Sequence, residues 1–125
     1  MILDTNGLSA LADGDMAVAE ILNSVSRLAI PVIVLGEYRF GIAQSRHRPK
    51  YETWLQALLT ECKVLNADQQ TAVEYAEVRR ELKREGRPIP ANDLWISAIA
   101  RQHRMPLLSR DQHFDFVSGL HRVSW

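Results

Sequence analysis

The chain has 125 residues, 46% of them hydrophobic, which is the size and apolar content of one ordinary domain with a substantial core. Lys+Arg and Asp+Glu number 15 each, so the net charge is zero. The overall charge therefore does not indicate a nucleic-acid binder, a membrane-surface protein or an enzyme for acidic substrates. A single cysteine, Cys62, excludes an internal disulfide and a cysteine-rich zinc site, and no run approaches the ~20 apolar residues of a membrane span, so we expect one cytoplasmic domain over residues 1–125.

Short strands and helices take turns along the first half of the chain. Apolar periodicity predicts strands at 1–3, 28–30 and 63–65, and helices at 8–12, 16–24, 32–44 and 49–59. The turn signal Asp13-Gly14-Asp15 separates the first two helices. Pro31 suits the start of the third helix, because a first turn has no amide partner to lose there.

The second half continues the same alternation. Asp68 is placed to cap a long helix that reaches about Glu85, and the break Gly86-Arg87-Pro88-Ile89-Pro90 ends it. A further helix starts at Asn92 or a neighbour and runs to about His103, and strands follow at 105–109 and 120–123. The pattern predicts an α/β fold, a short parallel sheet of about five strands with helices on both faces.

Four acidic residues, Asp4, Glu37, Asp93 and Asp111, each lie within or beside apolar sequence. A carboxylate is rarely buried unless its charge is compensated. Asp4 ends the first predicted strand, Asp111 follows the fourth, and Glu37 and Asp93 lie near the starts of helices. Because ligands bind at the carboxyl ends of parallel strands, we expect all four at one edge of the sheet.

Taken singly, three of these acids have ordinary explanations. Glu37 could pair with a basic residue or be half exposed on its helix. Asp93 could cap a helix, although Asn92 beside it could cap equally well. Asp111 could form a turn after its strand. Asp4 is hardest to explain in this way, because its strand is too short to place it on a solvated face.

A cluster of acids carries an electrostatic cost. Two carboxylates ~4 Å apart repel by about 4 kcal/mol at an effective dielectric near 20, so a cluster requires protonation or a divalent cation. Oxygen ligands without His or Cys partners favour magnesium or manganese over zinc. Such ions suit phosphodiester hydrolysis, and Asn6 and Ser109 are placed to orient the ligands or hold water.

Four segments follow one another along the chain: Leu3-Asp4-Thr5-Asn6, Gly36-Glu37 with Gly41, Asp93-Leu94-Trp95-Ile96-Ser97-Ala98-Ile99-Ala100 and Leu108-Ser109-Arg110-Asp111-Gln112-His113-Phe114. This ordered set resembles the successive motifs of the PIN-domain family, and above all of the VapC toxins of bacterial and archaeal toxin–antitoxin pairs. The resemblance covers essentially the whole chain.

This resemblance implies a magnesium- or manganese-dependent endoribonuclease. It also implies a homodimer and a cognate antitoxin whose C-terminal segment enters a groove of the toxin. On the matching positions, Asp4 and Asp93 would be the principal metal ligands, and Glu37 and Asp111 would complete the acidic cluster. The matching polar residues Asn6 and Ser109 would support them.

Two further residues near the last motif, Asp115 and His113, could be taken for members of the site. Asp115 lies one helical turn beyond Asp111 and competes with it as the late acid; we favour Asp111, which is nearer the strand end, and expect Asp115 at the surface or at a cap. His113 has no His or Cys partner at a recognisable spacing, so we expect a structural or surface residue rather than a general base.

RNA requires positive charge near the acids. The candidate residues are Arg46, His47, Arg48 and Lys50, and later Arg79, Arg80, Lys83, Arg84 and Arg87. Glutamates are interleaved with the second group, so for most of these side chains we expect ordinary helix pairs on a solvated face. Arg87 precedes the loop to Asp93, and it and the first group are placed to reach a phosphate at the site.

Tyr51, Trp54 and Leu58 form a one-sided stripe, and with Tyr38 and Phe40 we expect them in the core. A stripe left uncovered by the sheet would instead offer a docking face for an antitoxin segment or a second subunit.

Two further functions remain open. A magnesium phosphohydrolase with an aspartyl nucleophile is disfavoured, because Thr5-Asn6 follows Asp4 without a second aspartate two residues on. A non-catalytic module that binds RNA or protein is disfavoured by the complete acidic set.

Overall fold

A computed structural model describes all of residues 1–125. The chain runs through strands and helices in alternation, ending with a short 3-10 helix, η1, and a last strand. The elements are β1 (Ile2–Leu3), α1 (Thr5–Ala12), α2 (Met16–Asn23), β2 (Ala29–Pro31), α3 (Val32–Ala43), α4 (Arg48–Leu59), β3 (Lys63–Leu65), α5 (Gln69–Arg84), α6 (Ala91–His103), β4 (Leu107–Leu108), η1 (Gln112–Phe116) and β5 (Arg122–Val123).

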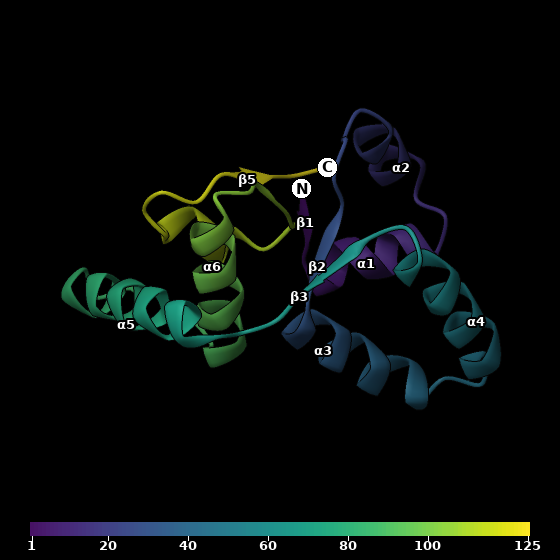
Figure 1. Cartoon of the computed structure of the whole chain (residues 1–125), viewed down its shortest axis with the longest axis horizontal. Coiled ribbons are helices and arrows are strands. Elements are labelled where there is room, and N and C mark those ends of the chain that lie inside the picture. Colours follow the sequence, from purple (N-terminus) through teal and green to yellow (C-terminus); the bar gives the residue numbers. More distant parts are fainter.

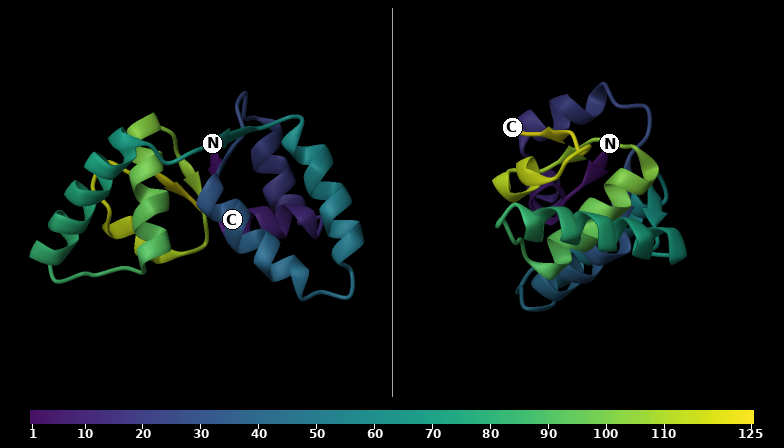
Figure 2. Two further views of the ribbon diagram at one scale, coloured as in Figure 1. Left: turned by 60° about the horizontal axis from the view of Figure 1, so that its bottom comes forward. Right: turned by 90° about the vertical axis from the view of Figure 1, so that its left-hand side faces the viewer.

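The five strands form one parallel sheet in the order β3-β2-β1-β4-β5. The chain steps outward from β1 to β3 and then returns through α5 and α6 to β4, on the other side of β1. Right-handed crossovers therefore place α1 to α4 and α5 to α6 on opposite faces. Figures 1 and 2 show α5 and α6 on one side of the strands and α1, α2 and α4 on the other, which confirms the predicted α/β architecture.

Two apolar clusters hold these layers together. The larger has 18 buried residues and joins the strands to α1, α3, α4 and α6. Its largest fully buried side chain is Phe114 of η1. The smaller cluster holds five buried residues, among them Leu82, Ile89 and Leu94, and it fastens α5 to α6 and to the loop between them.

The predicted boundaries differ from the observed ones mainly where side chains cap helices. The first helix begins at Thr5 rather than residue 8, because the Asp4 carboxylate accepts the Thr5 amide and opens the helix early. Asp68 caps α5 as predicted, in a reciprocal capping box with Thr71. The η1 turn was not predicted. None of the six α-helices combines the length and apolar character needed to span a bilayer.

The stripe on α4 lies against the rest of the domain. Tyr51, Trp54 and Leu58 pack on the main core, and the Tyr51 hydroxyl donates to Asp13 at 2.8 Å. Trp54 meets the buried ring of Tyr38 at a centroid distance of 6.3 Å. The core expectation holds for these residues but is wrong for Phe40, which is 61% exposed because it lies on the outer side of α3.

Candidate functional site

The candidate site lies at the carboxyl ends of the central strands β1 and β4. Ile2 pairs with Leu107 and Leu3 with Leu108, so the next residues in register, Asp4 and Ser109, emerge side by side. The Asp4 amide continues the ladder by donating to the Leu108 carbonyl at 3.1 Å. Neighbouring parallel strands thus deliver two polar side chains to one point, as expected for such a sheet edge.

Asp4 is only 5% exposed, and its carboxylate is held from three sides. It accepts hydrogen bonds from the Thr5 amide at 2.7 Å, the Ser109 hydroxyl at 2.7 Å and the Asn6 amide group at 3.1 Å. Burial raises the pKa of Asp4, whereas these donors oppose the rise. The charged form is therefore fixed in orientation, without a cationic side chain to neutralise it.

Asn6 and Ser109 also connect the first strand to the last acidic motif. The Asn6 side-chain carbonyl accepts the Arg110 amide at 3.1 Å, and the Ser109 hydroxyl oxygen accepts the Asp111 amide at 3.0 Å. Both side chains therefore bind Asp4 and order the loop after β4, and their support of a metal site stays a prediction.

Asp93 and Asp111 approach one another from α6 and the start of η1. A carboxylate oxygen of each and a ring nitrogen of His113 all lie within 4.8 Å of one another. The His113 Nδ1 atom is 3.1 Å from Asp111 and 3.4 Å from Asp93. The N-cap position of α6 is Pro90, and no backbone amide donates to the Asp93 carboxylate. Helix capping therefore does not explain why Asp93 is at this position.

Glu37 reaches the same edge from α3. The Thr5 hydroxyl donates to its Oε1 atom at 3.2 Å, which ties it to the residue that follows Asp4. Its carboxylate makes no ion pair with a lysine or arginine. The structure therefore brings Asp4, Asp93 and Asp111 close enough for their charges to act on one another, and it links Glu37 to this edge of the sheet through Thr5.

Asp115 points elsewhere, as the sequence led us to expect. Its two carboxylate oxygens accept Nε and a terminal nitrogen of Arg122 at 2.7 and 2.8 Å. The Arg122 guanidinium holds the pKa of Asp115 below its usual range and also donates to the Ser109 carbonyl at 3.0 Å. Asp115 thus anchors η1 to β5.

His113 is the site residue that sequence reasoning missed. It was expected to be structural or at the surface; it is 47% exposed, yet its imidazole sits between two acids. The cause is local, because Asp111 caps η1 by accepting the His113 amide at 2.9 Å, and this tight turn returns the His113 side chain toward Asp111. The two-residue spacing from an acid at a turn was the available signal.

The pKa of Asp93 is raised to about 6, chiefly by burial and then by repulsion from Asp111 and Asp4, while His113 opposes the rise. The folded protein therefore binds this proton more tightly than the unfolded chain, and stability without metal falls as pH rises from about 4 through about 6. Asp93→Asn removes the charge, so we expect it to stabilise the metal-free protein at pH 7 by roughly 1–3 kcal/mol, and by less towards pH 4.

Urea unfolding in a chelator at pH 4.5 and pH 7 measures this effect. Asp115→Asn is the matched control, and it should have the opposite sign, because it removes a carboxylate that Arg122 stabilises. Equal stability of Asp93→Asn and wild type at both pH values would contradict the predicted cost of the buried acid.

The first basic group, Arg46, His47, Arg48 and Lys50, spans the end of the loop after α3 and the first turn of α4. Arg48 pairs with Glu52 one helical turn later at 2.8 Å, and the neighbouring Arg46, His47 and Lys50 are exposed. This segment therefore has the character of a solvated helix start.

Comparison with known proteins gives one consistent family. The family model for the PIN domain matches residues 1–120. Ribonuclease VapC5 of Mycobacterium tuberculosis is 28% identical over 121 residues, covering 94% of this chain and 87% of that protein. The tRNA(fMet)-specific endonuclease VapC of Shigella flexneri is 25% identical, covering 99% and 96%. The crystal structure of VapBC2 from Rickettsia felis bound to a promoter DNA fragment superposes with a TM-score of 0.86 at 25% identity, covering 99% of this chain and 97% of that one.

Proposed function

The chain belongs to the PIN-domain family, and from this premise we propose that it is the toxin of a toxin–antitoxin pair, an endoribonuclease that hydrolyses RNA phosphodiester bonds with a divalent cation. The observation that carries the proposal is the group of four acids at one sheet edge, none of them paired with a lysine or arginine.

The donor set fits a divalent cation. Burial is the main reason why the pKa values of Asp4 and Asp93 are raised, and repulsion from Asp111 adds to the rise in both. A hard cation would remove that repulsion, and carboxylate oxygens are the ligands that Mg²⁺ and Mn²⁺ prefer. Asp4, Glu37, Asp93 and Asp111 would hold the ion, and the His113 nitrogen is a further donor beside two of them.

When bound, such an ion lowers the pKa of water and neutralises charge that develops on the phosphoryl oxygens. Hydrogen bonds within the chain fix the orientation of the acids. Ser109, Asn6 and the Thr5 amide hold the Asp4 carboxylate in one orientation, and the Thr5 hydroxyl orients Glu37. The His113 Nδ1 atom lies between Asp93 and Asp111, and its hydrogen bond opposes the rise in the pKa of Asp93.

Mn²⁺ or Mg²⁺ is expected to raise the melting temperature of the wild-type protein and to leave that of Asp93→Asn almost unchanged, since only the former keeps the ligand set. Differential scanning fluorimetry at pH 7 across a metal titration measures this. Asp115→Asn should respond like wild type. A shift of the same size in Asp93→Asn would place the bound ion elsewhere.

The proposal extends to partners. We propose a cognate antitoxin, because the Rickettsia felis relative is part of a VapBC complex, and a homodimer as the toxin's own assembly. Transfer RNA is the first substrate to test, because the Shigella flexneri relative is described as tRNA(fMet)-specific. We also place the activity in the cytoplasm, where such a substrate occurs.

Incubation of the free protein with RNA, with and without magnesium, tests the function. Cleavage that requires magnesium and that Asp93→Asn abolishes supports the nuclease. Phosphate release from a small monoester without RNA cleavage would support a phosphohydrolase, and metal-independent RNA binding alone would support a non-catalytic module.

A further inference from the structure

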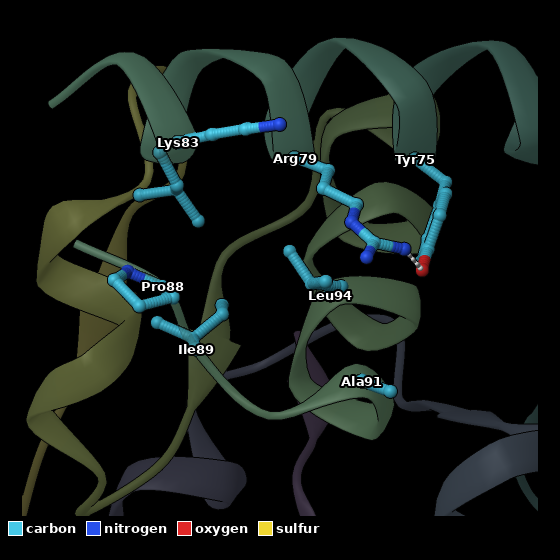
Figure 3. A pocket seen from close by; sticks show the side chains of 8 residues that line it. Tyr75, Arg79, Lys83, Pro88, Ile89, Ala91 and Leu94 are labelled. Carbon is cyan, nitrogen blue, oxygen red and sulfur yellow. Dashed lines mark hydrogen bonds between the residues drawn. The ribbon is translucent and has the colours of Figure 1, made fainter. Parts of the chain in front are cut away.

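A cavity of about 480 Å³ lies between α5, α6 and the loop that joins them. This volume falls within the ~300–1,000 Å³ of small-ligand pockets. Figure 3 shows Tyr75 and Arg79 reaching from α5 toward Leu94 of α6, with Pro88 and Ile89 closing one end. Ile89 and Leu94 are almost fully buried in the smaller core, so the floor of the cavity is apolar and firmly packed.

One wall of the cavity is a fixed aromatic ring. Tyr75 stacks on Trp95 with ring centroids 4.1 Å apart and planes inclined by 23°. Its hydroxyl oxygen accepts a hydrogen bond from Arg79 at 3.0 Å. A ring held by a neighbour and by its hydroxyl is a flat, preformed surface, and unpaired bases stack on such aromatic and arginine planes.

The acids of α5 are neutralised away from this cavity. Arg80 binds Glu77 at 2.8 Å, and Arg101 of α6 binds Glu74 at 3.3 Å and Glu81 at 2.8 Å. The sequence predicted that interleaved glutamates would pair with most of the basic group. Three of them, Glu74, Glu77 and Glu81, instead pair only with Arg80 and Arg101.

The cations that line the cavity have no such partner. Arg79 and Lys83 form no ion pair, and Lys83 runs along α5 toward Arg79 in Figure 3. Arg87, in the loop, lies 4.7 Å above the ring of Phe116, which belongs to η1. Arg79 is held beside the Tyr75 ring by its hydrogen bond to the hydroxyl, with its guanidinium carbon 6.0 Å from the ring centroid, but no acid neutralises it or Lys83. Positive charge without an acidic partner therefore borders an apolar pocket, and this combination is complementary to a base with its phosphates.

The cavity and the acidic cluster share the first turn of α6. Ala91 and Leu94 line the cavity, while Asp93 between them contacts His113 in the cluster. Neighbouring residues of one helical turn therefore serve the cavity and the acidic cluster.

We propose that this cavity receives one unpaired base of single-stranded RNA next to the phosphate that is cleaved. The base stacks on Tyr75 over the apolar floor, and Arg79 and Lys83 bind the adjoining phosphates. The inference rests on the proposed ribonuclease function and deepens it, because it makes an unpaired nucleotide beside the cut a requirement for substrate recognition.

The direct test is photo-crosslinking on the full chain carrying Asp93→Asn, which prevents cleavage. The probe is a single-stranded oligoribonucleotide with 5-iodouridine, and the crosslinked peptide is identified by mass spectrometry. We expect the crosslink at Tyr75. RNA that binds but crosslinks only outside the cavity overturns the proposal.

Variants in the same Asp93→Asn background give an independent measurement of affinity by fluorescence anisotropy. Ala91→Leu fills the cavity without changing charge, and Arg79→Gln removes a cation that has no acidic partner; each should weaken RNA binding about 5- to 100-fold. Arg80→Gln is the matched control, because its cation is already bound to Glu77, and it should change affinity less than about twofold. Should Ala91→Leu fold poorly, the pair of arginine variants decides.

Other outcomes assign the cavity differently. Unchanged RNA affinity in both variants, together with a changed oligomeric state in size-exclusion chromatography, overturns the proposal in favour of a second copy of the chain. Unchanged affinity with loss of antitoxin binding overturns it in favour of a protein segment. RNA that binds through the cavity but is not cut by the wild-type protein refutes the proposed function; the cavity then remains a site for an unpaired base, and its link to a cleaved phosphate is overturned.

Discussion

Asp93→Asn is expected to lower magnesium-dependent RNA cleavage by roughly 10³-fold, equivalent to about 4 kcal/mol of transition-state stabilisation. The substitution keeps the size of the side chain but removes the charge that would hold the cation. The same charge is costly in the metal-free fold, where burial and the neighbouring acids raise the pKa of Asp93 to about 6. The variant should therefore be inactive and yet more stable at pH 7. This is the pattern expected of a residue whose buried charge lowers the stability of the fold but is required for activity.

Initial rates on a fluorogenic RNA measure this prediction, with unfolding in urea measured on the same preparations. Asp115→Asn is the control, since that acid is held by Arg122 rather than facing the cluster. The cleavage rate of Asp4→Asn should fall as far as that of Asp93→Asn, because Asp4 is the most buried acid of the site. Activity of Asp93→Asn within tenfold of wild type would remove this residue from the proposed ligand set.

Phe114→Ala is expected to lower the free energy of unfolding by about 3–5 kcal/mol, the usual loss for a fully buried phenylalanine. Phe114 is the largest fully buried side chain and carries η1 into the main core. Because domains of this size are stable by only about 5–15 kcal/mol, the loss is a large share of the total. It should also reduce cleavage, since η1 begins at Asp111 and holds His113.

Phe116→Ala provides the matched control within the same turn. Phe116 is 37% exposed and lies under Arg87, so its loss should cost less than about 1 kcal/mol. Chemical denaturation with an unchanged m-value separates the two variants. Equal losses at both positions would contradict the anchoring role of Phe114.

Much of the fold could be predicted because its signals are local. The strand at Lys63–Leu65 and the cap at Asp68 were predicted to the residue, since a short apolar run and a capping side chain act within a few positions. The η1 turn was missed because it is one short 3-10 segment without helical periodicity, and its burial depends on Phe114 reaching a core made by distant strands.

The acidic set itself was predicted with its order and its place at the sheet edge, because a parallel sheet brings strand ends together whatever the details of packing. The choice of Asp111 over Asp115 agrees with their positions, since Arg122 engages only Asp115. That contact joins residues from η1 and β5, so sequence spacing alone could favour Asp111 but could not supply the partner that removes Asp115.

By itself, the sequence determined which residues carry charge into apolar surroundings and in which order the strands and helices follow. Those properties depend on side-chain chemistry and on hydrophobic periodicity, which are local. Only the tertiary structure decided which neighbours each charged group meets. His113 comes to lie between Asp93 and Asp111, and Arg79 donates to the Tyr75 hydroxyl without an acidic partner, while Arg80 binds Glu77. Pairing of charges depends on distances of a few ångströms between elements far apart in the chain, and it is the packing of α6 against η1 and α5 that sets those distances.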